Sequence, residues 1–187
     1  MRAIDEVNRD YREIFDAYAL VTGEGDVHAR LMLVGEAPGA QEEQLRRPFV
    51  GAAGKNLDAF LEGVALRREA LYITNSVKFR PTRQGASGRL SNRTPTREEV
   101  ALFRPWLLEE ITAVQPAVVA TLGNTALRAV TGRENIVIGD VHGQPLETGE
   151  GYDVFPLYHP ASIIYRPQLK ATYAEDIEKL RKFLRSL

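Results

Sequence analysis

The sequence contains no cysteine among its 187 residues. This absence excludes disulfide bonds, thiolate metal sites, cysteine-bound iron–sulfur clusters and cysteine nucleophiles. Long hydrophobic runs are also missing, because the longest, Leu31–Val34 and Ala117–Leu122, are far too short to cross a bilayer, and the N-terminus lacks the apolar core of a signal peptide. Apolar residues make up 44% of the chain, enough for one buried core. We therefore expect a single domain over residues 1–187 that works as a monomer in the cytoplasm and binds no membrane.

The net charge of −1 conceals an uneven distribution. Residues 1–44 carry four arginines against ten acidic residues, whereas residues 78–104 carry seven basic residues against only Glu98 and Glu99. The second segment has the charge of a surface that meets phosphate groups. A solvated, arginine-rich loop is an equally good explanation of the charge alone.

Short apolar runs alternate with amphipathic segments along the chain. Buried strands are predicted at 31–34, 71–74 and 117–122, and weaker ones at 136–138 and near 152–157. Helices are predicted within 4–18, 57–64, 96–114 and 173–187, with a shorter one after Gly123. Pro105 predicts a kink or a break in the third of these long helices. The alternation predicts an α/β fold: a three-layer α/β/α sandwich with a central, mostly parallel four-stranded sheet.

Polar or conformationally unusual residues follow four of the predicted strands. They are the loop Gly35–Gly39, Asn75, Gly123-Asn124 and His159-Pro160. Ligands of open parallel sheets bind beyond the carboxyl ends of the strands, so these residues mark a candidate site. Phe49 fits no amphipathic pattern and presents either an aromatic face to a flat ligand or a core contact. His159 is likewise either a hydrogen-bond donor to a ligand or a core residue.

Two further motifs resemble sites of other chemistry. Gly54-Lys55-Asn56 is similar to the end of a nucleotide-binding P-loop, but Phe49 stands at the first glycine position and Asn56 replaces Ser/Thr. Residues 137–143, VIGDVHG, resemble the first metal-binding motif of metallophosphatases. Only three histidines are present and no second aspartate-rich motif follows, so a turn with a structural His142 is the favoured interpretation.

Six blocks in order resemble the uracil-DNA glycosylase superfamily, most closely its family 4. They are GEAPG (35–39), RPFVG (47–51), YITNSVKFRP (72–81), NRTPTREE (92–99), LGNTAL (122–127) and His159-Pro160. The resemblance implies hydrolysis of the N-glycosidic bond of uracil in DNA after base flipping, which leaves an abasic site. The implied partner is uracil-containing DNA.

The chain departs from this family at the cofactor. Members of family 4 carry four cysteines that bind a four-iron–four-sulfur cluster, whereas Phe79 and Phe103 stand at what look like two of those positions. We therefore expect no metal and no cofactor, and packing around these two rings in place of the cluster. The loop 83–91 looks like an insertion and lacks the histidine with which some relatives trap the abasic sugar. A lesion- or abasic-site-binding protein without efficient turnover is the alternative function.

The resemblance also implies roles for individual residues. Phe49 stacks on the flipped uracil, Asn75 reads its N3–H and O4 edge, and His159 donates a hydrogen bond to O2 of the leaving base. Glu36 positions the attacking water, within a loop where Gly35 and Ala37 also meet the substrate. In the best-known relatives an activating Asp stands at the position of Ala37. Glu42 excludes thymine by crowding its methyl group.

Contacts with the DNA backbone are expected from two regions. The first supplies Arg80, Arg89 and Arg93, which predict salt-sensitive binding. The second is ASIIYR, residues 161–166, where Ala161, Ser162 and Arg166 approach the DNA and exposed apolar side chains wedge into the base stack. Burial of Ile163 and Ile164 in the core is the alternative there.

Overall fold

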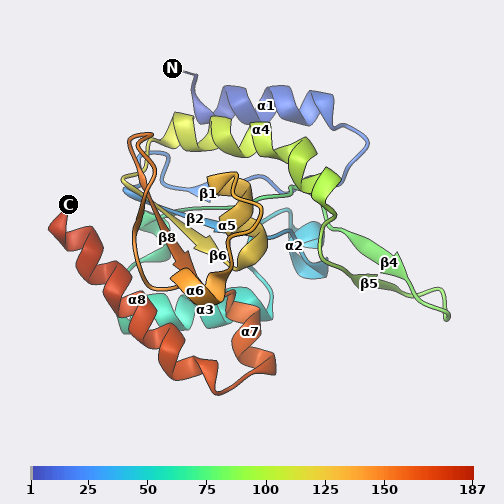
Figure 1. Cartoon of the computed structure of the whole chain (residues 1–187). Helices are drawn as coiled ribbons and strands as arrows, with labels where there is room; N and C mark the ends of the chain where they lie inside the picture. The colour runs from blue at the N-terminus through green and yellow to red at the C-terminus, as the bar shows by residue number, and fades with distance from the viewer. Residues whose placement is uncertain (1) are drawn as a thin grey trace.

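The computed structural model describes residues 2–187 and is built on a sheet with the strand order β1-β3-β2-β6-β8-β7 (Figure 1). The four inner strands pair in parallel. They are β3 (Tyr72–Asn75), β2 (Leu31–Gly35), β6 (Val118–Leu122) and β8 (Asp153–Leu157). Every residue of β2, β3 and β6 is buried, as expected of strands covered on both faces.

The predicted number of four strands is wrong, because a short antiparallel strand is added at each edge. These are β1 (Glu24–Gly25), which pairs with β3, and β7 (Leu146–Glu147), which pairs with β8. Two-residue strands have no hydrophobic period to read in a sequence. They form because the outer strands of the parallel sheet present unpaired backbone groups.

Helices cover both faces of the sheet and make the three predicted layers (Figure 1). Side chains alternate along β2, so that Leu31 and Leu33 enter one core while Met32 and Val34 enter the other. The first core is closed by α3 (Ala52–Gly63) and α8 (Leu169–Ser186). The second is closed by α4 (Arg97–Val114) and α5 (Asn124–Thr131), and α1 (Ile4–Ile14) packs on α4. None of the helices in the described part of the chain is both long and apolar enough to span a membrane.

The remaining elements are short and lie in the connections. They are α2 (Ala40–Leu45), a 3-10 turn (Arg68–Ala70), α6 (Ile138–Val141), α7 (Pro160–Tyr165) and the hairpin β4–β5 (Thr82–Gln84 and Leu90–Asn92). The hairpin contains the predicted insertion and projects from the body of the molecule (Figure 1).

One local prediction is wrong: residues 136–138 form no strand, because Ile138 begins α6 and its N–H is bonded to the Asn124 side chain at 2.8 Å. Of the kink or break predicted at Pro105, no break occurs, because α4 runs from Arg97 to Val114 as one element. Its burial of Phe103, Trp106 and Leu107 on either side of the proline supplies the packing that keeps it whole.

Packed aromatic rings fill the region of Phe79 and Phe103. These two rings lie 5.6 Å apart between centroids, and Phe15 stacks on Phe103 at 4.4 Å. Tyr18 contacts Phe79 at 4.6 Å, and the Trp106 ring lies 6.2 Å from those of both Phe15 and Phe103. The two positions that the family resemblance links to cluster cysteines are therefore occupied by an aromatic core that joins α1 to α4.

Candidate active site

A cavity of about 460 Å³, here called the base cavity, lies beyond the carboxyl ends of β2, β3 and β8. Several of the predicted site residues line it together. They are Glu36, Ala37, Glu42, Phe49, Asn75, Arg93, His159 and Ala161. An aromatic ring, a carboxamide and an imidazole that are remote in the sequence thus share one cavity.

Gly35 explains how Phe49 and Asn75 come together. It ends β2 beside Asn75 of β3, and the Phe49 ring lies over it. A Cβ atom at Gly35 would lie 2.4 Å from the Asn75 Oδ1 and 2.5 Å from the Phe49 Cζ. The absence of a side chain here therefore allows the two groups to meet over the strand end.

The loop that carries Phe49 is fastened by one carboxylate and one guanidinium. Phe49 has a left-handed backbone with φ of 52°, which is costly for a bulky residue and needs support from its surroundings. The Glu42 carboxylate accepts hydrogen bonds from Val50 N–H at 2.9 Å and Gly51 N–H at 2.7 Å. Arg68 donates to the carbonyls of Pro48 and Phe49, at 2.7 and 3.1 Å. Glu42, which was predicted to exclude thymine, thus holds the backbone of the Phe49 loop in place. Arg68 was not identified from the sequence.

His159 is held as a neutral hydrogen-bond donor. Its Nδ1 accepts from the Ala161 N–H at 3.1 Å, so the proton of the neutral ring is on Nε2. Burial lowers the pKa of His159 to about 4, against a smaller opposing effect of the Glu42 charge. Its ring centroid lies 6.0 Å from that of Phe49. At neutral pH the imidazole therefore offers an N–H without a positive charge.

Glu36 is oriented by a residue that the sequence analysis did not single out. The Thr125 hydroxyl donates to the Glu36 Oε2 at 2.7 Å. Thr125 belongs to the block LGNTAL at the start of α5, so two of the blocks that resemble the family meet in this bond. The block itself was the available signal, but nothing in one sequence identifies Glu36 as the partner of Thr125.

A buried ion pair lies beneath Asn75. Lys78 is fully buried, donates to the Asn75 carbonyl at 2.7 Å and to the Thr74 hydroxyl at 2.6 Å, and pairs with Glu110 of α4. Burial lowers the pKa of Lys78, and the Glu110 carboxylate opposes that shift. Lys78 therefore supports the end of β3 and adds no positive charge to the surface.

The arginines predicted to contact the DNA backbone differ in whether other residues of the protein already bind them. Arg80 is bonded to Asn92 at 2.7 Å and to Glu43 at 3.2 Å, and its side chain is 14% exposed. Arg93 makes a two-point contact with Glu99 at 2.7 and 2.6 Å. Arg89 is exposed on the projecting hairpin. The first two arginines thus fix the base of the hairpin beside the base cavity.

The segment after His159 divides between the core and the surface. Ile163 is buried, as the alternative interpretation had it, whereas Ile164 is 47% exposed and Tyr165 is 82% exposed. Ser162 is partly buried and Arg166 is exposed at the end of α7. The exposed apolar side chains lie one helical turn from the rim of the base cavity.

The motif that resembles metallophosphatases (137–143) and the one that resembles a P-loop (54–56) make contacts that support the fold. His142 pairs with the buried Asp176 at 2.6 Å, which also binds Lys179 at 3.0 Å. Within residues 2–187, no three His, Asp or Glu side chains gather as they would around a metal ion. A Cβ atom at Gly54 would lie 1.9 Å from the Phe49 carbonyl oxygen, so this glycine permits close packing of α3 against the Phe49 loop.

Most of this chain is similar to uracil-DNA glycosylases. The family model described as the uracil DNA glycosylase superfamily matches residues 22–185. A type-4 uracil-DNA glycosylase of Thermotoga maritima is 38% identical over 89% of this chain and 83% of its own length. One of Archaeoglobus fulgidus is 39% identical over 86% and 79%, respectively. A type-5 uracil-DNA glycosylase of Pyrobaculum aerophilum is 34% identical over 74% and 64%.

Proposed function

Because this chain belongs to the uracil DNA glycosylase superfamily, we propose that it removes uracil from DNA by hydrolysing the N-glycosidic bond and leaves an abasic site. The reaction repairs the product of cytosine deamination, and its partner is uracil-containing DNA. The observation that carries the proposal is the meeting of Phe49, Asn75 and His159 in one cavity.

Recognition of the base uses the first two of these groups. The flipped uracil stacks on the Phe49 ring, and the Asn75 carboxamide pairs with its N3–H and O4. Cytosine presents the opposite donor and acceptor pattern on this edge, so both polar groups of the Asn75 carboxamide would be left unpaired. That loss costs about 1–3 kcal/mol for each buried group, which favours uracil.

Bond cleavage uses His159 and Glu36. As the bond between C1′ and N1 breaks, negative charge spreads to O2 of the uracil, and the His159 Nε2–H donates to it. A preorganised donor of this kind is typically worth about 10²–10³ in rate. The Glu36 carboxylate, fixed by Thr125, orients the water whose oxygen bonds to C1′ and takes up the proton that this water loses, while the uracil leaves as an anion. The carboxylate charge also stabilises the cationic sugar.

Flipping needs a group that fills the space left by the base. Tyr165 and Ile164 are the exposed apolar side chains nearest the His159 turn, and we assign the wedge to them. Arg89 and Arg166 are both exposed and can contact the DNA backbone. Truncation of Tyr165 and Ile164 to alanine should weaken excision from duplex DNA more than from single strands, because only duplex DNA needs the base stack opened.

Excision is tested with an oligonucleotide that contains one uracil. The protein is incubated with it in EDTA, and abasic sites are then cleaved with alkali. We expect strand cleavage with the wild type and with the matched control His28→Ala, whose side chain is exposed, and a loss of about 10² or more with His159→Ala. Retarded DNA without cleavage would instead establish the abasic-site-binding alternative and refute the hydrolase.

A further inference from the structure

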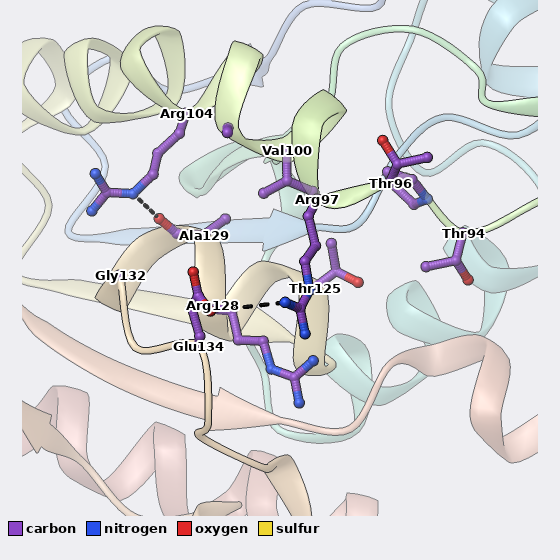
Figure 2. Close-up of a pocket in the computed structure, with 12 residues that line it drawn as sticks. Thr94, Thr96, Arg97, Val100, Arg104, Thr125, Arg128, Ala129, Gly132 and Glu134 are labelled. Carbon is purple, nitrogen blue, oxygen red and sulfur yellow. Dashed lines mark hydrogen bonds and ion pairs between the residues drawn. The ribbon is translucent and has the colours of Figure 1, made fainter.

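A second pocket, of about 540 Å³, lies between α4 and α5 (Figure 2). We call it the arginine pocket. Its apolar wall is made by Val100 and Ala101 of α4 and Ala129 of α5, and the Arg97 and Arg128 side chains extend toward one end of it (Figure 2). An apolar wall with cations at one end matches the two parts of a nucleotide, which are a flat or apolar nucleoside and a charged phosphate.

The arginine pocket adjoins the base cavity. Thr94 lines both of them. Thr125 lines the arginine pocket and donates its hydroxyl hydrogen to Glu36 of the base cavity. A strand with one nucleotide in the base cavity can therefore continue into the arginine pocket over Thr94.

Arg97 and Arg128 can each offer N–H donors to a phosphate. Arg97 is 88% exposed, and its only ion pair in the described residues is with Glu134 at 3.9 Å, itself 81% exposed. Such an exposed pair is worth little, so a phosphate can take the place of Glu134. Arg128 uses its Nε to bind the Ile136 carbonyl at 3.1 Å, which fixes the side chain and leaves both terminal nitrogens without a hydrogen bond within residues 2–187.

A third arginine, Arg104, also lines the arginine pocket, but its guanidinium is directed elsewhere (Figure 2). Arg104 donates from Nε to the Ala129 carbonyl at 2.8 Å, and in Figure 2 its guanidinium points away from those of Arg97 and Arg128. Its Nη2 would lie 3.2 Å from a Cβ at Gly132, where φ is 67°. Arg104 thus ties the last turn of α5 to α4.

We propose that the arginine pocket binds one nucleotide of the DNA strand that leaves the base cavity, with its phosphodiester between Arg97 and Arg128 and its nucleoside against Val100 and Ala101. The inference rests on the proposed function, since a strand is placed here only if its target nucleotide enters the base cavity. The ligand is a single-stranded segment, because the nucleoside must leave its base stack to reach the apolar wall.

The experiment measures binding of a fluorescent single-stranded oligonucleotide with a tetrahydrofuran abasic-site analogue at the target position. Fluorescence anisotropy at several salt concentrations is compared for the wild type, Arg97→Ala/Arg128→Ala, and the matched control Arg9→Ala/Arg185→Ala, which removes two exposed charges on α1 and α8. We expect the first double variant to raise Kd about tenfold and to lower the slope of log K against log salt by about 0.7, the value for one phosphate of a single strand. The control should change neither quantity.

Two further measurements locate the contact. Replacing strand phosphates one at a time by neutral methylphosphonates should reveal one position that weakens binding to the wild type and has no further effect in Arg97→Ala/Arg128→Ala. Filling the apolar wall with Ala101→Trp should raise Kd without changing the salt slope. Equal effects of every methylphosphonate in both proteins, or equal Kd values for the two double variants, would overturn the inference. The proposed function fails separately, if the wild type releases no uracil.

Discussion

Replacement of Gly35 by alanine tests the central geometry of the base cavity. The new Cβ would lie 2.4 Å from the Asn75 Oδ1 and 2.5 Å from the Phe49 Cζ, whereas ordinary contacts begin at 3.4 Å. Each side chain must therefore move by about 1 Å, and a misplacement of this size in a catalytic site costs on the order of 10²-fold in rate. Because both groups are proposed to hold the uracil, the single-turnover rate of excision should fall by at least that factor.

The fold should survive this substitution better than the activity. Gly35 does not adopt a left-handed backbone, so alanine is compatible with the strand, and the strain falls on two side chains that border a cavity. Single-turnover excision of uracil and the midpoint of thermal unfolding are measured for Gly35→Ala and for Gly63→Ala, where a Cβ meets nothing within 4 Å. A Gly35→Ala protein that is folded and excises uracil at the wild-type rate would refute the assignment of Phe49 and Asn75.

Three other predictions follow from contacts of the same cavity. Arg68→Ala releases the carbonyls of the Phe49 loop and should raise KM about tenfold, with partial recovery in Arg68→Lys, checked by steady-state excision kinetics. Thr125→Val frees the Glu36 carboxylate and should lower the single-turnover rate about tenfold with little change in DNA affinity, which anisotropy measures. His159 has a folded pKa of about 4, below its unfolded value, so its contribution to stability is complete above about pH 6.5 and is lost as the pH falls toward 4. Urea unfolding should therefore show the wild type losing about 2 kcal/mol more than His159→Gln between pH 7 and pH 4.5; equal losses would contradict a buried neutral imidazole.

A count of charges does not show which basic side chains are paired with an acidic side chain. For residues 78–104 the charge left open an electropositive surface or a solvated, arginine-rich loop, and in the structure Lys78 is buried against Glu110 and Arg93 is paired with Glu99. Exposed positive charge of this segment lies on Arg83 and Arg89 of the hairpin and on Arg97 beside the arginine pocket. Partners such as Glu110 come from another element, so their effect exists only after folding.

The amino-acid sequence alone determined the order of the four inner strands and of the long helices, and the edge of the sheet at which the site lies. Apolar runs that end in Gly35, Asn75 or Gly123 identify parallel strands and their carboxyl ends, and chain order then places their loops together. The ordered blocks, with Phe49 and His159 among them, identified the family. These are local properties, in which a few neighbouring residues carry the whole signal.

Tertiary structure decided how the site is held. Arg68 reaches the Phe49 loop from 19 residues away, and Thr125 reaches Glu36 across 89 residues. The edge strands β1 and β7 likewise exist only because a neighbouring strand offers free hydrogen-bonding groups. A contact between distant residues depends on the path of the whole backbone, and spacing within one sequence does not contain that path.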